Sequence, residues 1–318
     1  MLRMFNIRGA TLRDQPVDEN NLKAALDSAV WIDAHEPSEE ERELLNTFLR
    51  AELPESDDVE EIEFSARYFQ DGAGLHVHSL FLSPAGDGRH STVTVAFILQ
   101  DKRLITLRDG DLADFRLLRM RARRGQVQAS SPQDLLITMF EQKVENLADV
   151  LEDIHRKLED VSHLVLEDDD AELEDAIDKL AKLEDSNGKI RLSLMDTQRS
   201  ISFLQRHLRE HFELQETARE IKRDVDTLMS HTAFLFDKIN FLMDSTQGFI
   251  NIEQSQIIKT FSIAAVVFLP PTVVASIYGM NFELMPELNW KFGYIWALVI
   301  MVMSGIAPYL YFKHKDWL

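Results

Sequence analysis

A short polar link, YGMNFELMPELNW at residues 278–290, carries the side chains best suited to bind a metal cation. Asn281 offers a neutral amide oxygen, and Glu283 and Glu287 offer carboxylates. The link has no cysteine and no histidine, and the oxygens of its amide and carboxylate groups are hard donors. Mg²⁺ prefers oxygen ligands and gives up its water shell reluctantly, whereas Zn²⁺ prefers nitrogen and sulfur. These residue types therefore favour a hydrated Mg²⁺ ion over Zn²⁺.

Asn281 suits the mouth of a pore if several copies of the chain surround one axis. A collar of amide oxygens would hold a hydrated ion weakly and from many sides, which conduction requires. Glu283 and Glu287 would raise the local cation concentration at the entrance. The alternative is a hairpin loop that is polar without a further role, and the link alone leaves both interpretations open.

Two apolar runs flank the link and predict two transmembrane helices. Residues 260–282 and 292–312 contain no charged residue, and about 20 apolar residues are enough to cross roughly 30 Å of hydrocarbon. The alternative is a buried helical hairpin in a soluble core. Lys259 precedes the first run, and Lys313 and Lys315 follow the second. Between the two runs the only basic residue is Lys291. The positive-inside rule then places both termini in the cytoplasm and the link outside an inner or plasma membrane.

One face of the first apolar run is small or weakly polar. With steps of three and four residues, a single helical stripe holds Ile258, Ser262, Ala265, Leu269, Thr272 and Ser276. Small residues permit close helix packing, but they could also line a narrow pore built by a ring of subunits. Pro270 and Pro271 leave carbonyls one turn back without donors, and either water or a neighbouring helix would have to cover them.

The elements in front of the link predict an α/β cytosolic domain followed by long α-helices. Strand patterns occupy 31–33, 74–83, 91–100 and 103–109, and helical patterns occupy 36–49 and 111–124. Ser131 and Pro132 start a proline-free helical region with breaks near 167–172 and 207–216. A last helix from about residue 215 continues into the first apolar run as a stalk of more than 50 residues. The predicted divisions are 1–130 (α/β domain), 131–258 (long helices), 259–281 (first span), 282–291 (link), 292–312 (second span) and 313–318 (basic tail).

The overall composition narrows the class of function. The net charge is −20 and there is no cysteine, which disfavours nucleic acid and anionic lipid headgroups as partners and excludes disulfides and thiolate metal sites. We find no nucleophile elbow, P-loop or HExxH pattern, so no ATP and no enzymatic activity are expected. The remaining metalloenzyme cue is His76 and His78, which share one face of a predicted strand.

The link and its neighbours resemble the CorA family of magnesium transporters, in its proteobacterial branch. The resemblance rests on YGMNFELMPELNW between two C-terminal spans, on FLPPT at 268–272 and on the tail YFKHKDWL. It implies a funnel-shaped homopentamer in which the first spans line the pore, and a selectivity filter at Gly279, Met280 and Asn281. It also implies a hydrophobic gate near Ile258 and Phe261, with Ser255 where relatives often carry an asparagine. Ala265, Leu269 and Thr272 fall on the pore-facing stripe of the family.

The resemblance further implies inhibition by cytosolic Mg²⁺ bound between subunits, for which the stalk offers Glu220, Asp224 and Asp226. Asp168 to Asp170 could meet Lys313 and Lys315 of the tail. Transport of Co²⁺ and Ni²⁺ is also expected, and the membrane potential would drive influx. Two alternatives stay open: a zinc transporter of the same superfamily, and a non-transporting, membrane-anchored helical sensor.

Overall fold

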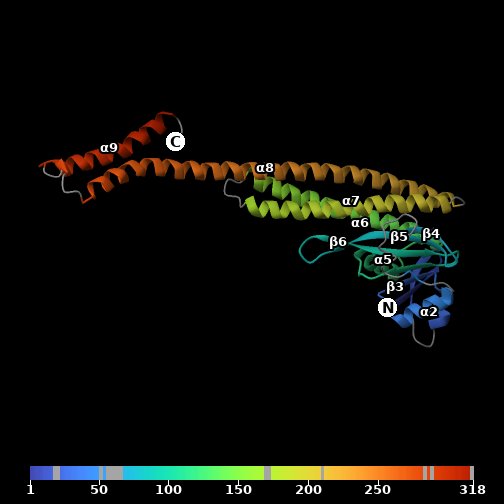
Figure 1. Cartoon of the computed structure of the whole chain (residues 1–318). Helices are drawn as coiled ribbons and strands as arrows, with labels where there is room; N and C mark the ends of the chain where they lie inside the picture. The colour runs from blue at the N-terminus through green and yellow to red at the C-terminus, as the bar shows by residue number, and fades with distance from the viewer. Residues whose placement is uncertain are drawn as a thin grey trace. The chain divides into compact units, whose positions relative to one another are not determined.

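The computed structural model describes the chain except residues 17–21, 50–52, 55–66, 168–172, 209–210, 282–284, 287–289 and 316–318. The chain divides into two compact units, Met1–Met243 and Asp244–Leu318. The division falls inside one continuous helix, α8 (Phe212–Tyr278), which is 67 residues long (Figure 1). The predicted stalk of more than 50 residues is therefore confirmed, and it begins three residues earlier than expected.

A seven-stranded sheet forms the base of the first unit, in the order β2-β1-β3-β7-β6-β5-β4. Strands β3 (Trp31–His35) and β7 (Leu104–Arg108) are parallel neighbours. Strands β5 (Leu75–Pro84), β6 (His90–Leu99) and β7 form an antiparallel meander, with Gln100 N donating to Arg103 O across the β6–β7 turn. These four strands are the ones that hydrophobic runs bounded by Gly, Asp and Pro predict.

The sequence analysis missed the strands at the two edges of the sheet, β1 (Leu2–Arg8), β2 (Thr11–Gln15) and β4 (Tyr68–Gln70). The turn between β1 and β2 places both Gly9 (φ 58°) and Ala10 (φ 60°) in the left-handed region. A type I′ hairpin turn needs positive φ at both central positions, and Gly-Ala is not a usual pair for it. The turn chemistry therefore gave little indication of this hairpin.

Side-chain caps mark the starts of α2 (Glu39–Leu49) and α6 (Pro132–Glu167). In α2, Glu41 N donates to Ser38 Oγ at 3.3 Å and Ser38 N donates to Glu41 Oε2 at 3.0 Å, a reciprocal capping box. In α6, Asp134 N donates to Ser131 Oγ at 3.1 Å, and proline takes the first helical position. The predicted start at Ser131 and Pro132 is confirmed, and α7 (Leu173–His207) follows the predicted break.

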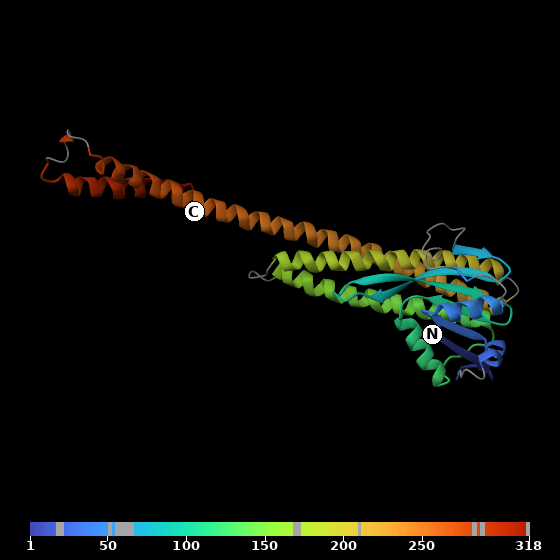
Figure 2. The same ribbon diagram turned by 60° about the horizontal axis from the view of Figure 1, so that its bottom comes forward.

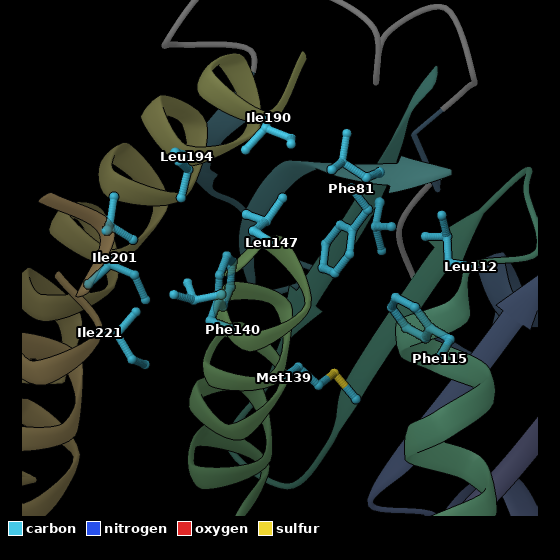
Figure 3. Packing of buried hydrophobic residues seen from close by; sticks show 14 of the residues in the cluster. Phe81, Leu112, Phe115, Met139, Phe140, Leu147, Ile190, Leu194, Ile201 and Ile221 are labelled. Atoms are coloured by element: carbon cyan, nitrogen blue, oxygen red, sulfur yellow. The ribbon is translucent and has the colours of Figure 1, made fainter. Parts of the chain in front are cut away.

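Helices cover both faces of the sheet (Figure 2). Helices α1 (Leu22–Ser28) and α2 cover one face over a small apolar core. Helices α5 (Ala113–Arg123), α6, α7 and the first part of α8 share a larger core with the other face. Figure 3 shows Phe81 of β5 facing Phe140 and Leu147 of α6, with Ile201 of α7 and Ile221 of α8 beyond them. The α/β domain and the long helices are thus one packed body, which confirms that part of the predicted fold class.

Two buried carboxylates join this body together. Asp196 of α7 accepts hydrogen bonds from Ser79 Oγ (2.6 Å), Leu80 N (2.8 Å), Arg67 Nη1 (3.1 Å) and Tyr68 OH (3.2 Å), and Lys143 Nζ lies 3.8 Å away. A second carboxylate, Asp33 of β3, pairs with Arg108 Nη2 at 3.1 Å and Arg119 Nη1 at 3.0 Å. Burial lowers the pKa of Lys143 to about 8, although Asp196 and Asp114 act in the opposite direction.

The second unit contains the end of α8 and the helix α9 (Gly293–His314). Both α8 and α9 include stretches long and apolar enough to cross a membrane, and those stretches are almost wholly exposed on the single chain. A soluble core helix would be mostly buried, so the alternative of a buried hairpin in a soluble core is not what this chain forms on its own.

Candidate pore helix and filter

The predicted stripe of small residues lies on an exposed face of α8. Every member from residue 258 to residue 276 is exposed, and Ile258 and Leu269 keep 65% and 62% of their surface. Phe261, assigned to the gate, is 73% exposed. Within this chain the stripe therefore contacts no other helix extensively.

The opposite face of α8 is the one that packs within the hairpin. The half-buried residues of this stretch are Ile263, Val267, Pro270, Pro271, Val274 and Tyr278. At 100° per residue, their mean direction is roughly opposite to that of the small stripe. On this face Gly305 of α9 comes so close that a Cβ on it would lie 3.2 Å from Pro271 Cγ. The sequence left close packing and pore lining open as explanations of the small stripe, and the contact between Gly305 and Pro271 does not involve it.

Two hydroxyls near the ends of the stripe are oriented by their own helix. Thr272 Oγ1 donates to Phe268 O at 2.8 Å, and Ser255 Oγ donates to Asn251 O at 2.8 Å. A hydroxyl has one donor and two lone pairs, so donation back to the helix leaves the lone pairs for outside partners. Both side chains are exposed. They can therefore accept hydrogen bonds from water that surrounds a cation.

Helix α8 ends at Tyr278, immediately before the triplet Gly279, Met280 and Asn281. Gly279 N still donates to Ala275 O at 3.0 Å, and Met280 N donates to Ile277 O at 3.2 Å. Gly279 directly follows the last residue of the helix, where glycine is common, and it is not among the glycines with positive φ. A side chain at this position would crowd the backbone, because a Cβ would lie 3.3 Å from Ala275 O. Asn281 follows with an exposed side chain, while Glu283 and Glu287 lie outside the described residues.

The sequence analysis overlooked the face of α9 that meets α8. Gly293 and Ala297 are the buried residues of α9, and Ser304, Gly305 and Pro308 are half-buried. Small residues four apart bring transmembrane helices into close contact. The spacing from Gly293 to Ala297 was a sequence signal for this interface that we had applied only to the first span.

The candidate regulatory carboxylates do not gather at one place. Glu220 and Asp224 are one turn apart on an exposed side of α8, and both raise the pKa of Glu141 on α6, after burial and Glu145. Asp226 instead accepts a hydrogen bond from Gln198 Nε2 at 2.6 Å. Among the described residues, no three histidine or carboxylate side chains are placed to hold a metal ion. Asp168 to Asp170, the expected partners of the tail, lie outside the described residues.

The histidine pair on β5 is built into the core of the first unit. His76 Nε2 lies 2.9 Å from Asp71 Oδ1, and its ring stacks on Phe69 with 4.2 Å between centroids. Burial lowers the pKa of His76, although Asp71 acts in the opposite direction. The rings of His76 and His78 are 6.2 Å apart. Asp71 and Phe69 thus explain the position of His76 without a metal.

Comparison with known proteins places this arrangement in a family. The family described as "CorA-like Mg2+ transporter protein" matches residues 27–314. The chain is 48% identical to the magnesium transport protein CorA of Pectobacterium atrosepticum and 47% identical to that of Escherichia coli, in each case over 319 aligned positions that cover both chains completely.

Solved structures agree on the fold. The complete CorA magnesium transporter of Methanocaldococcus jannaschii superimposes with a TM-score of 0.74, covering 100% of this chain and 99% of the other. The two sequences are 17% identical, so this likeness concerns the fold alone. It includes the long helix and the C-terminal hairpin as well as the α/β domain.

Proposed function

This chain belongs to the family of CorA-like Mg²⁺ transporter proteins, as its motifs predicted, and from this premise we propose that it conducts Mg²⁺ into the cytoplasm. The magnesium transport proteins to which it is similar match along their entire length, which supports the proposal for the α/β domain, α8 and α9 alike. The residues for conduction would be those of α8 and of the triplet that follows it.

The main observation in support of this proposal is that two opposite sides of α8 differ in their contacts. One side contacts α9 at Gly305, and the other side is an exposed stripe that is small or hydroxyl-bearing except at Ile258 and Leu269. A single helix cannot enclose a channel. We therefore propose a ring of identical chains, a homopentamer in keeping with the family resemblance, in which each α8 contributes one wall.

Within such a ring, the residues take distinct roles. Gly279, Met280 and Asn281 would form the filter, with the amide oxygen of Asn281 facing the water shell of Mg²⁺. Ile258 and Phe261 would narrow the cytoplasmic end, and Ser255 and Thr272 would offer hydroxyl lone pairs along the path. Glu283 and Glu287 would attract cations to the outer mouth without contacting the ion in the filter.

The same proposal covers topology and control. The first unit would lie in the cytoplasm, with both termini, and α8 and α9 would span the inner membrane. The membrane potential supplies about 2.3 kcal/mol per elementary charge per 100 mV, twice that for a divalent ion.

Glu220 and Asp224, whose charges raise the pKa of Glu141, would take part in binding cytosolic Mg²⁺ between neighbouring chains. Loss of that ion would let the acidic chains repel one another and open the ring. Co²⁺ and Ni²⁺ would share the path.

The test is Mg²⁺ uptake into liposomes that contain the purified full-length chain and a trapped Mg²⁺-sensitive dye. We expect Asn281→Ala to lower the initial rate at least tenfold, about 1.4 kcal/mol. The matched control is Asn240→Ala, which changes an exposed asparagine inside α8, far from the filter along the chain, and should leave the rate unchanged. Normal uptake by Asn281→Ala would exclude the filter assignment, and faster Zn²⁺ than Mg²⁺ uptake would favour the zinc transporter.

A further inference from the structure

We propose that Gly305 is a positioning residue for transport: it lets α9 support α8 at the turn that Pro270 and Pro271 interrupt. The inference rests on the proposed function, since it concerns the shape of the helix that would line the pore. It goes beyond the filter and the pore stripe, because Gly305 lies on α9 and contacts the opposite face of α8.

The two prolines create a local weakness in α8. Neither has a backbone N–H, so the carbonyl groups of Val266 and Val267 lose the donors that a continuous helix would provide four residues later. In hydrocarbon an uncovered carbonyl is costly, and helices with internal prolines depend on neighbouring groups to cover it. The helix therefore needs an external support at this level.

Gly305 occupies the place where that support is needed. An ideal Cβ on this glycine would lie 3.2 Å from Pro271 Cγ and 3.5 Å from the carbonyl oxygen of Val267. The backbone of α9 thus approaches one of the two carbonyls that the prolines leave without a donor. Because glycine has no Cβ, no side chain of residue 305 separates the α9 backbone from this carbonyl.

A side chain at residue 305 would separate the two helices. Alanine would put a methyl group 3.2 Å from Pro271 Cγ, which is shorter than an ordinary van der Waals contact. Leucine would push α9 away from the proline turn. The Val267 carbonyl would then face lipid, and α8 would bend to find another partner. Because the opposite side of the same turns carries Leu269 and Thr272, such a bend would move the residues that line the proposed pore.

The test combines substitutions at the two contacting residues in full-length protein, with dye-monitored Mg²⁺ uptake in liposomes. We expect Gly305→Ala to lower the maximal rate about threefold or more, and Gly305→Leu more strongly. The Mg²⁺ concentration that gives half-maximal uptake should stay the same, since the filter residues are untouched. Gly248→Ala is the matched control: Gly248 lies inside α8, and an ideal Cβ on it would meet no atom within 4 Å, so the rate should not fall.

The second arm asks whether Gly305 acts through Pro271. Pro271→Ala restores an N–H for the Val267 carbonyl and removes the Cγ atom that a side chain at residue 305 would meet. Gly305→Ala should therefore lower the rate much less in the Pro271→Ala background than in the wild type. Equal effects in both backgrounds, or wild-type rates in Gly305→Leu, would overturn the role of Gly305. Absence of uptake by the wild-type chain would instead overturn the proposed function, and this inference with it.

Discussion

The two units of this chain treat their polar groups in opposite ways. In Met1–Met243, polar and charged side chains are buried and paired within one chain, as Asp33 is with Arg108 and Arg119. In Asp244–Leu318, the polar side chains of α8 are exposed, from Ser255 to Asn281, while apolar residues surround them. Buried charges are costly unless partners compensate them. The first unit therefore contains its own partners, whereas the second presents groups whose partners must come from outside the chain.

This difference distinguishes polar groups that stabilise the fold from polar groups that are available to bind a partner. The carboxylate of Asp196 contacts donors from β5 and from the segment before β4, all inside one core. The carboxylate of Asp196 therefore needs no ligand to compensate its charge. The stripe on α8 is arranged in the reverse way, because its hydroxyls satisfy their donors locally and leave acceptors outward. Such a surface is suited to contact with water, with ions and with other copies of the chain.

The largest effect should follow from breaking the internal pairing of the first unit. Asp196→Ala would leave Arg67 and Lys143 as buried cations without their carboxylate. Removing one partner of a buried pair typically costs about 3–5 kcal/mol. We expect a large drop in the thermal midpoint of the full-length protein, measured by tryptophan fluorescence or near-ultraviolet circular dichroism.

The matched control for Asp196 is a carboxylate in an exposed pair. Asp178 lies 2.7 Å from Lys182 on the surface of α7, and exposed pairs contribute little. Asp178→Ala should leave the midpoint nearly unchanged. If the two substitutions gave equal losses, the contrast between buried and exposed polarity would not hold.

The next prediction concerns the exposed stripe, where a substitution should alter transport and not stability. Ala265 lies on the stripe, and its neighbour Ala264 is equally exposed but points about 100° away around α8. Ala265→Phe should narrow the proposed pore and lower Mg²⁺ uptake at least tenfold, while Ala264→Phe should keep it within about twofold. Both variants should melt like the wild type. Equal uptake by the two would contradict the orientation of α8 in a ring.

The sequence could predict what local patterns determine. Strands β3, β5, β6 and β7, the helix start at Ser131 and the long α8 follow from periodicity, capping groups and the absence of proline. The family followed from one short motif beside two apolar runs. The stripe on α8 was also predictable, because helical geometry alone defines which residues share a face.

Contacts between distant segments could not be predicted in this way. Asp196 meets Arg67 across 129 positions, and no spacing rule connects them. Gly305 was a glycine in an apolar run until the structure placed it against Pro271. The close approach of Gly279 to the Ala275 carbonyl, whose oxygen would lie 3.3 Å from a Cβ, is also visible only in the structure.

The smallest predicted effect tests the exception in the first unit, a buried carboxyl that is only partly paired. Asp114 Oδ2 accepts from Asn146 Nδ2 at 3.3 Å, and Oδ1 has no hydrogen-bond partner in the described part of the chain. Burial raises the pKa of Asp114 from 3.8 to about 6, although Lys143 acts in the opposite direction. The folded state then binds this proton more tightly than the unfolded state, so its contribution to stability is present below pH 3.8 and is lost as the pH rises through 6. At pH 8 the buried charge should lower the stability of the folded state, and Asp114→Asn should raise the thermal midpoint there but change it little at pH 4. The exposed Asp101→Asn should show no such difference between the two pH values. A gain for Asp114→Asn of the same size at pH 4 and pH 8 would show that packing, and not charge, is responsible.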